Sequence, residues 1–147
     1  MLQFSKSICF ILMTAALLVI APVNSRFAEA AEDTELAKQM EVIQDNLKKL
    51  RKSVKSAAEN AQSLESLDKM QQATVASKAM TPAKAKSVPE AERAKFLAGY
   101  RKDMAALLEH LCKIEMALLD NDNAKAEELF KGLKKVEDDG HEKYSDE

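Results

Sequence analysis

Residues that break or cross-link a fold are scarce in this sequence. Its 147 residues include three glycines, three prolines, two cysteines and no tryptophan. Cys9 lies in an N-terminal segment that we expect to be removed, which leaves Cys112 without a partner for an intramolecular disulfide. No segment alternates apolar and polar residues with a period of two, and Ala, Leu, Lys, Glu and Met dominate. This composition predicts an all-α protein.

The N-terminal segment has the pattern of a secretory signal peptide. Lys6 is the only charged residue before an apolar run over residues 8–21, and Ala28-Glu29-Ala30 follows as a small-x-small cleavage site. At about 1.5 Å per residue, this run is too short to cross a hydrocarbon core of roughly 30 Å. We therefore predict a signal peptide at residues 1–30 and one exported domain at residues 31–147, which is not inserted in the membrane.

Neither sign of charge is in large excess. The chain carries 22 basic and 24 acidic residues, a formal net charge of −2. A slightly acidic protein is poorly suited to bind nucleic acid or an anionic membrane surface, and we expect neither as a partner. An exported domain without disulfides depends on packing, or on a bound group, for its stability.

Apolar residues at helical spacing are abundant. The first stripe has alternate steps of four and three, which is the pattern of one helix face, and it predicts a helix from about residue 33 to residue 55. Its members are Leu36, Met40, Ile43, Leu47, Leu50 and Val54. Such a stripe is not stable alone and needs other helices to cover it.

Three further helices follow. Residues 58–63 predict the first connection, and the second helix ends before Thr81-Pro82 because the residue before proline disfavours the α conformation. Ser87 is predicted to cap the third helix, and Asn121-Asp122-Asn123 to end it and to cap the fourth. The apolar stripe of the second helix includes Leu64, Leu67, Met70, Val75 and Met80. That of the third includes Leu97, Tyr100, Met104, Leu107, Leu111, Ile114 and Leu118. That of the fourth includes Leu129, Phe130, Leu133, Val136, His141 and Tyr144. Four amphipathic helices with short links predict an antiparallel up-down-up-down four-helix bundle.

This topology brings Met40 and His141 to one end of the bundle. Met40 is near the start of the first helix, and His141 is near the end of the fourth, which is its neighbour. A thioether and an imidazole beside an apolar, aromatic wall suit haem iron with two axial ligands. Methionine on such a stripe is more often core filler, however, and a histidine near a helix C-terminus often only complements the helix dipole.

Several segments resemble the cytochrome b562 family. They are MEVIQDNLK at 40–48, LDKM at 67–70, AMTP at 79–82, Phe96 with Gly99 and Tyr100, and HEKY at 141–144. The resemblance covers nearly all of the expected mature chain in order. It implies a periplasmic electron carrier that is not an enzyme, a monomer with a redox partner protein, and one non-covalent haem b per chain. It implies Met40 and His141 as axial ligands, and Met70, Phe96 and Tyr100 as the wall of the pocket.

The sequence also departs from this family. Glu137 and Ser145 stand where the family usually has arginine, and Gly140 stands where an aromatic residue is expected. Covalent haem attachment would need a Cys-x-x-Cys-His motif, which this sequence lacks. His110 is expected at the far end from Met40, on the surface or flanking the core. The alternative interpretation is a haem-free periplasmic four-helix-bundle protein that serves as a binding or adaptor module.

Overall fold

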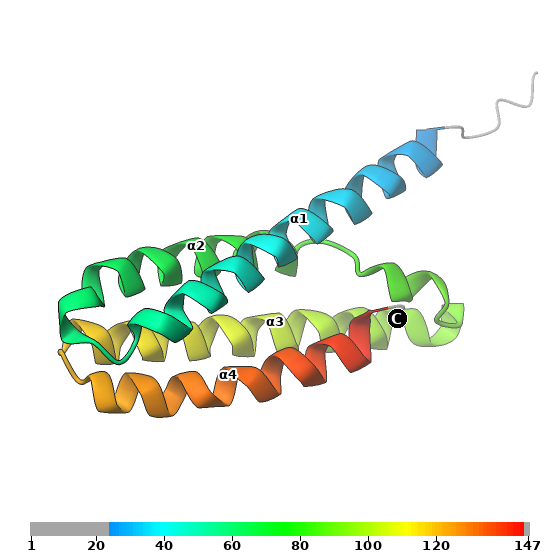
Figure 1. Cartoon of the computed structure of the whole chain (residues 1–147). Helices are drawn as coiled ribbons and strands as arrows, with labels where there is room; N and C mark the ends of the chain where they lie inside the picture. Colours follow the sequence, from blue (N-terminus) through cyan, green and yellow to red (C-terminus); the bar gives the residue numbers. More distant parts are fainter. Residues whose placement is uncertain (1–23, 146–147) are drawn as a thin grey trace, which may run out of the picture.

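The computed structural model describes residues 24–145, with side chains from Glu35 onward. Figure 1 shows an antiparallel up-down-up-down bundle of four helices, and the described residues contain no strand. The helices are α1 (Asn24–Ser53), α2 (Asn60–Lys78), α3 (Glu90–Leu119) and α4 (Asn123–Tyr144). Two short 3-10 helices, η1 (Ala57–Glu59) and η2 (Ala83–Lys86), lie in the connections. The predicted all-α four-helix bundle is confirmed.

The most deeply buried side chains gather toward the end of the bundle where α1 turns into α2 and α3 turns into α4. Each of the four helices contributes to this core, which includes Leu50, Leu67, Leu111, Ile114, Leu118 and Ala126, all at most 1% exposed. Burying one large aliphatic side chain stabilises a fold by about 1.5–3 kcal/mol. Most residues of the predicted stripes therefore do face inward, and they hold this end of the bundle together. Val75 is an exception, because it is 51% exposed and Ala73, Thr74 and Ser77 occupy the inward face of that part of α2 instead.

Asparagines join the two connections at this end. The side-chain amide of Asn123 donates to the carbonyl of Val54 at 2.9 Å and to Oδ1 of Asn60 at 2.7 Å. Asn121 has φ 58°, a left-handed conformation that asparagine adopts more readily than most residues. Asp122 caps α4 by accepting a hydrogen bond from the Lys125 amide at 2.9 Å. The predicted break at residues 121–123 is therefore confirmed.

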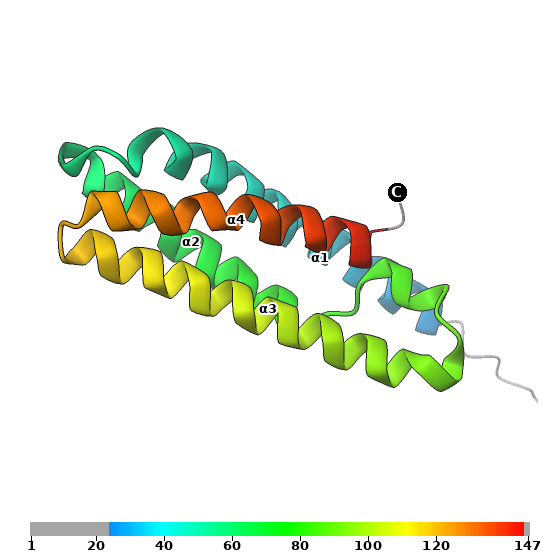
Figure 2. The same cartoon turned by 90° about the horizontal axis from the view of Figure 1, so that it is seen from below.

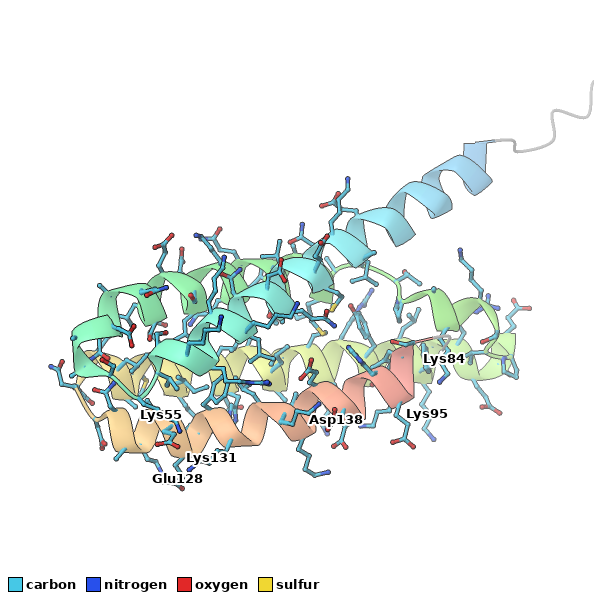
Figure 3. The ribbon with its side chains drawn as sticks, in the orientation of Figure 1. Lys55, Lys84, Lys95, Glu128, Lys131 and Asp138 are labelled. Atoms are coloured by element: carbon cyan, nitrogen blue, oxygen red, sulfur yellow. The ribbon has the colours of Figure 1, made fainter. Side chains whose placement is uncertain are left out.

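Charged side chains project outward from the bundle, as Figure 3 shows for Lys55 in the turn after α1 and for Lys131 and Asp138 on α4. Most ion pairs join residues of one helix, but Glu127 of α4 lies 3.2 Å from Lys55 and 3.1 Å from Lys131. It therefore ties the segment that follows α1 to α4. Exposed pairs of this kind stabilise a protein by at most about 1 kcal/mol, so the apolar core dominates the stability.

Three predicted helix boundaries are wrong. Helix α1 begins at Asn24 rather than near residue 33, because the Ala- and Glu-rich residues before Glu35 are good helix formers. Helix α2 begins at Asn60, so the first connection is not at 58–63. Asn60 is buried, and its side-chain amide donates to the carbonyl of Leu118 at the end of α3 and to Oδ1 of Asn121 in the α3–α4 connection, both at 3.3 Å. Ser87 does not cap α3, because its hydroxyl donates to the carbonyl of Lys84 at 2.8 Å and Pro89 occupies the cap position.

At the other end the bundle is open. Helix α1 packs along α2, α2 along α3 and α3 along α4, but α1 diverges from the bundle toward its N-terminus (Figures 1 and 2). The backbones of α1 and α4 are consequently not in extensive contact. Residues of both helices line a cavity between them.

Most of the predicted signal peptide lies outside the described residues. Residues 1–23 are not described, and the predicted cleavage point after Ala30 falls within the helical backbone of α1. Among the described helices, none combines the length and the apolar character needed to span a bilayer.

Replacing Cys112 by alanine tests the packing of α3. Cys112 is a half-buried free thiol next to the fully buried Leu111. A thiol in this position acts as a small apolar side chain, so Cys112→Ala should lower the free energy of unfolding by about 0.5–1 kcal/mol and leave a monomer. Urea unfolding and size-exclusion chromatography measure both quantities. Loss of a dimer in the variant would instead identify Cys112 as an intermolecular contact.

Candidate functional site

A cavity of about 680 Å³ lies at the open end of the bundle. This volume is in the range of small-molecule and cofactor pockets, roughly 300–1,000 Å³. Helices α1 and α4 form two facing walls, and α2, η2 and α3 complete it. Its apolar lining includes Leu36, Ile43, Leu47, Met70, Pro82, Tyr100, Met104, Leu107, Leu133 and Val136. The cavity therefore suits a large apolar ligand.

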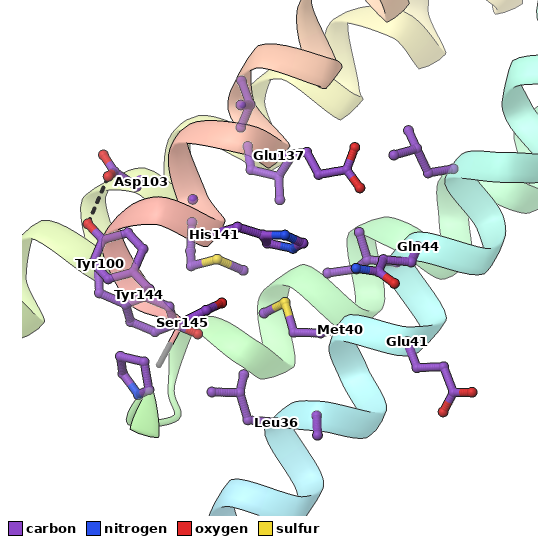
Figure 4. A pocket seen from close by; sticks show the side chains of 18 of the residues that line it. Leu36, Met40, Glu41, Gln44, Tyr100, Asp103, Glu137, His141, Tyr144 and Ser145 are labelled. Atoms are coloured by element: carbon purple, nitrogen blue, oxygen red, sulfur yellow. Dashed lines mark hydrogen bonds between the residues drawn. The ribbon is translucent and has the colours of Figure 1, made fainter. Parts of the chain in front are cut away.

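Met40 and His141 enter this cavity from opposite walls. Figure 4 shows Met40 extending from α1 and the His141 ring extending from α4 into the same space. Met40 is half-buried and His141 is exposed. Among the side chains drawn in Figure 4, no marked hydrogen bond engages the imidazole. The two side chains that the sequence predicts to share one end of the bundle thus line one cavity.

The three predicted wall residues are not equivalent. Met70 and Tyr100 line the cavity, and both are buried. The Tyr100 hydroxyl donates to the carbonyl of Ser77 at 2.9 Å, and burial raises the pKa of Tyr100 to about 12. Phe96 is not among the residues that line the cavity; its ring packs edge-on against Tyr144 at a centroid distance of 5.4 Å. A direct contact between Phe96 and a cofactor stays a prediction.

Tyr144 and Asp103 also line the cavity, and sequence reasoning did not assign them to the site. The Tyr144 hydroxyl donates to Oδ2 of Asp103 at 2.8 Å, and Lys143 donates to the same oxygen at 3.1 Å. Partial burial alone would raise the pKa of Asp103, but these two hydrogen bonds outweigh it and the pKa lies below its ordinary value. Partial burial and the hydrogen bond to Asp103 both raise the pKa of Tyr144. No sequence signal links two residues 41 positions apart.

Acidic groups are prominent around the cavity. Glu41, Asp103 and Glu137 contribute to its lining. The nearby lysines of α4 are engaged by carboxylates: Lys134 lies 2.6 Å from Asp138, and Lys135 lies 3.1 Å from Asp139. The acidic run at 137–139 is thus largely paired within its own helix.

The donor groups and the space fit a haem. Among the described residues, no cluster of three or more His, Cys, Asp or Glu side chains could hold a metal ion. The cavity offers two groups that can bind haem iron, the thioether of Met40 and the imidazole of His141. Such a pair is typical of haem iron in electron carriers. Gly140 also lines the cavity, and a Cβ atom built there meets nothing within 4 Å, so room remains beside His141.

Fold and site together define an up-down-up-down bundle with an apolar cofactor cavity at one end, between its first and last helices. The sequence profile of cytochrome b562 matches residues 35–145 of the chain. The chain belongs to the cytochrome b562 family, whose members are electron-carrying, haem-binding helical proteins of the periplasm and not typically enzymes. Comparison with curated proteins returned no match.

Proposed function

We propose that this member of the cytochrome b562 family is an exported, monomeric b-type cytochrome that binds one haem b non-covalently and carries single electrons. Met40 and His141 are its axial ligands, Met70 and Tyr100 form the wall, and Phe96 supports that wall. The proposal is carried by one observation: Met40 and His141 line the same apolar cavity from facing helices.

The residues of the chain have separate roles in this proposal. When bound, haem supplies the one-electron chemistry of its iron. A Met ligand together with a His ligand raises the reduction potential, and an apolar wall limits the access of water to the iron. Cys112, the free cysteine of the described part, does not line the cavity, which supports non-covalent binding. We assign no catalytic turnover to the chain and expect a redox protein as its partner.

Haem titration tests the proposal. The chain should be expressed with its N-terminal segment, so that it can be exported, and then purified. The purified protein should take up one equivalent of haem with a sharp Soret band and should be reduced and reoxidised reversibly. A protein that stays colourless in excess haem would contradict the proposal and favour the haem-free adaptor.

Export is part of the same proposal. Lys6, the apolar run at residues 8–21 and Ala28-Glu29-Ala30 support cleavage after Ala30. N-terminal sequencing of the protein from the periplasmic fraction should read from Ala31. Recovery of a chain that still begins at Met1 would contradict removal of the segment.

Glu137 gives a prediction about haem affinity. Its half-buried side chain lines the cavity one helical turn before His141, and its nearest cation, Lys134, lies 3.8 Å away and also pairs with Asp138. Haem carries two propionates, and an exposed ion pair contributes about 0.2–1 kcal/mol. Glu137→Arg removes a like charge and adds an opposite one, so it should slow haem transfer to an apo-myoglobin acceptor about two- to tenfold at low salt.

Salt and a matched variant separate this effect from others. The difference in haem-transfer rate between Glu137→Arg and the parent should shrink as salt is raised, because ions screen exposed charges. Asp138→Arg changes the charge equally, but Asp138 does not line the cavity, so its effect should be smaller. A Glu137→Arg variant that transfers haem at the parent's rate at both low and high salt would locate the propionates away from α4.

A further inference from the structure

The last turn of α4 is held by contacts that come from other elements. This turn begins at His141, whose carbonyl accepts a hydrogen bond from the Ser145 amide at 3.0 Å. Terminal turns of helices fray easily because their hydrogen bonds open at low cost. Two residues of the turn, Lys143 and Tyr144, donate to Oδ2 of Asp103 on α3, at 3.1 Å and 2.8 Å. Asp103 is therefore a point at which this turn is joined to the rest of the bundle.

The ring of Tyr144 packs against aromatic side chains of α3. It packs edge-on against Phe96 and Tyr100, at centroid distances of 5.4 Å and 5.1 Å. A Cβ built on Gly99 would lie 3.5 Å from the Tyr144 hydroxyl, an ordinary van der Waals distance, so the hydroxyl lies directly over the backbone of α3 at this residue. The aromatic contacts fix the plane of the ring, and Asp103 fixes its outer end.

The turn is also held from the η2 side. The Lys84 ammonium donates to the carbonyl of Glu142 at 2.8 Å, which satisfies one of the free carbonyls at the end of α4. This contact restrains the backbone of the turn from the side of η2 and does not involve the side chain of Tyr144 or of Lys143. The side chains of Lys143 and Tyr144 join the same turn to α3, within three residues of His141.

We propose that Asp103 is the positioning residue for His141. By accepting hydrogen bonds from Tyr144 and Lys143, its carboxylate orients the last turn of α4 so that the imidazole points into the cavity. The inference rests on the proposed function in that His141 is taken as a ligand. It assigns a task to a residue 38 positions away in the sequence, on a different helix.

Two variants and one control test the proposal in the haem-free full chain. Tyr144→Phe removes one hydrogen bond with almost no change of shape, and Asp103→Asn removes the charge that both donors share. Glu109→Gln is the control, because Glu109 is a carboxylate of the same helix that pairs with Lys113 and does not line the cavity. Loss of a hydrogen bond to a charged group should raise the equilibrium constant for opening of the last turn of α4 by on the order of tenfold.

Amide hydrogen exchange and nuclear Overhauser contacts are the first readouts. Exchange of the amides at 141–145 should be on the order of tenfold faster in Asp103→Asn and Tyr144→Phe than in the parent. Contacts between the His141 ring and the cavity residues should weaken in both, and amides at 111–118 should be unchanged, which shows that the bundle is folded. The effect of the double variant should be less than the product of the two single effects, because both changes act on the same contact between Tyr144 and residue 103.

Haem affinity is the second readout. It should fall in Tyr144→Phe, which leaves the charge of Asp103 in place, by about the factor measured for the amides, and it should stay at the parent's value in Glu109→Gln. Unchanged exchange and unchanged His141 contacts would overturn the proposal, and so would faster exchange with unchanged His141 contacts and unchanged haem affinity. A parent that takes up no haem would refute the proposed function alone, since the contacts of His141 with the cavity still decide the role of Asp103.

Discussion

Haem affinity should fall by more than about 100-fold when His141 is replaced by alanine. Changing a residue that merely supports a metal ligand already costs about 10–100-fold in affinity, so losing the ligand itself should cost more. His141 enters the cavity from the last turn of α4, and its exposed side chain has little packing to lose. Titration of the haem-free protein with haem, followed at the Soret band, gives the affinity. The free energy of unfolding without haem should change little.

His110 is the matched control for this change. Its Nε2 lies 2.7 Å from the carbonyl of Leu129, and its ring fits against Gly132, so it joins α3 to α4 without lining the cavity. His110→Ala should therefore bind haem as the parent does and lose about 1 kcal/mol of stability with the hydrogen bond. Weaker haem binding in His110→Ala, with His141→Ala unaffected, would mean that the wrong histidine has been assigned.

Replacing Met40 by alanine should remove the thioether-to-iron absorption band and lower the reduction potential. A Met ligand raises the potential because it favours ferrous iron, and axial ligands set haem potentials over a range of about 0.8 V. We therefore expect a fall that is a substantial part of that range. Visible spectra of the oxidised protein and a redox titration measure the two effects.

Two further substitutions isolate the sulfur atom. Met40→Leu keeps most of the apolar volume, so it should change the spectrum as Met40→Ala does but cost less stability. Met104 also lines the cavity, and Met104→Leu should keep both the band and the potential. If Met40→Ala and Met40→Leu both have the parent's spectrum and potential, Met40 is not an iron ligand.

Most of the fold follows from local sequence patterns. Apolar residues at steps of three and four predict one buried face per helix, and Leu50, Leu67, Leu111 and Leu118 are indeed buried in the core. Asn121 and its neighbours predict the turn before α4, because these residues tolerate a left-handed backbone and cap helices. Such signals depend on a few adjacent residues, so they are readable without a structure.

Helix boundaries depend on more distant contacts. Ser87 has the sequence of a cap, but its hydroxyl hydrogen-bonds with Lys84 within the η2 connection. Asn60 was expected in a connection, yet it starts α2 because its side chain reaches the carbonyl of Leu118, 58 positions away. A polar residue near a helix end can satisfy several partners, and the tertiary structure selects among them.

Some features of the site also follow from the sequence, and others depend on the tertiary structure. The sequence by itself determined that Met40 and His141 lie at one end of the bundle, because four helices joined by short links leave little choice of topology. Only the tertiary structure decided that α1 diverges from α4 and leaves a cavity between them, and that Asp103 accepts hydrogen bonds from Lys143 and Tyr144. The physical reason is range: helical periodicity acts over three or four residues, whereas the width of a cavity and a hydrogen bond between two helices depend on how whole helices pack.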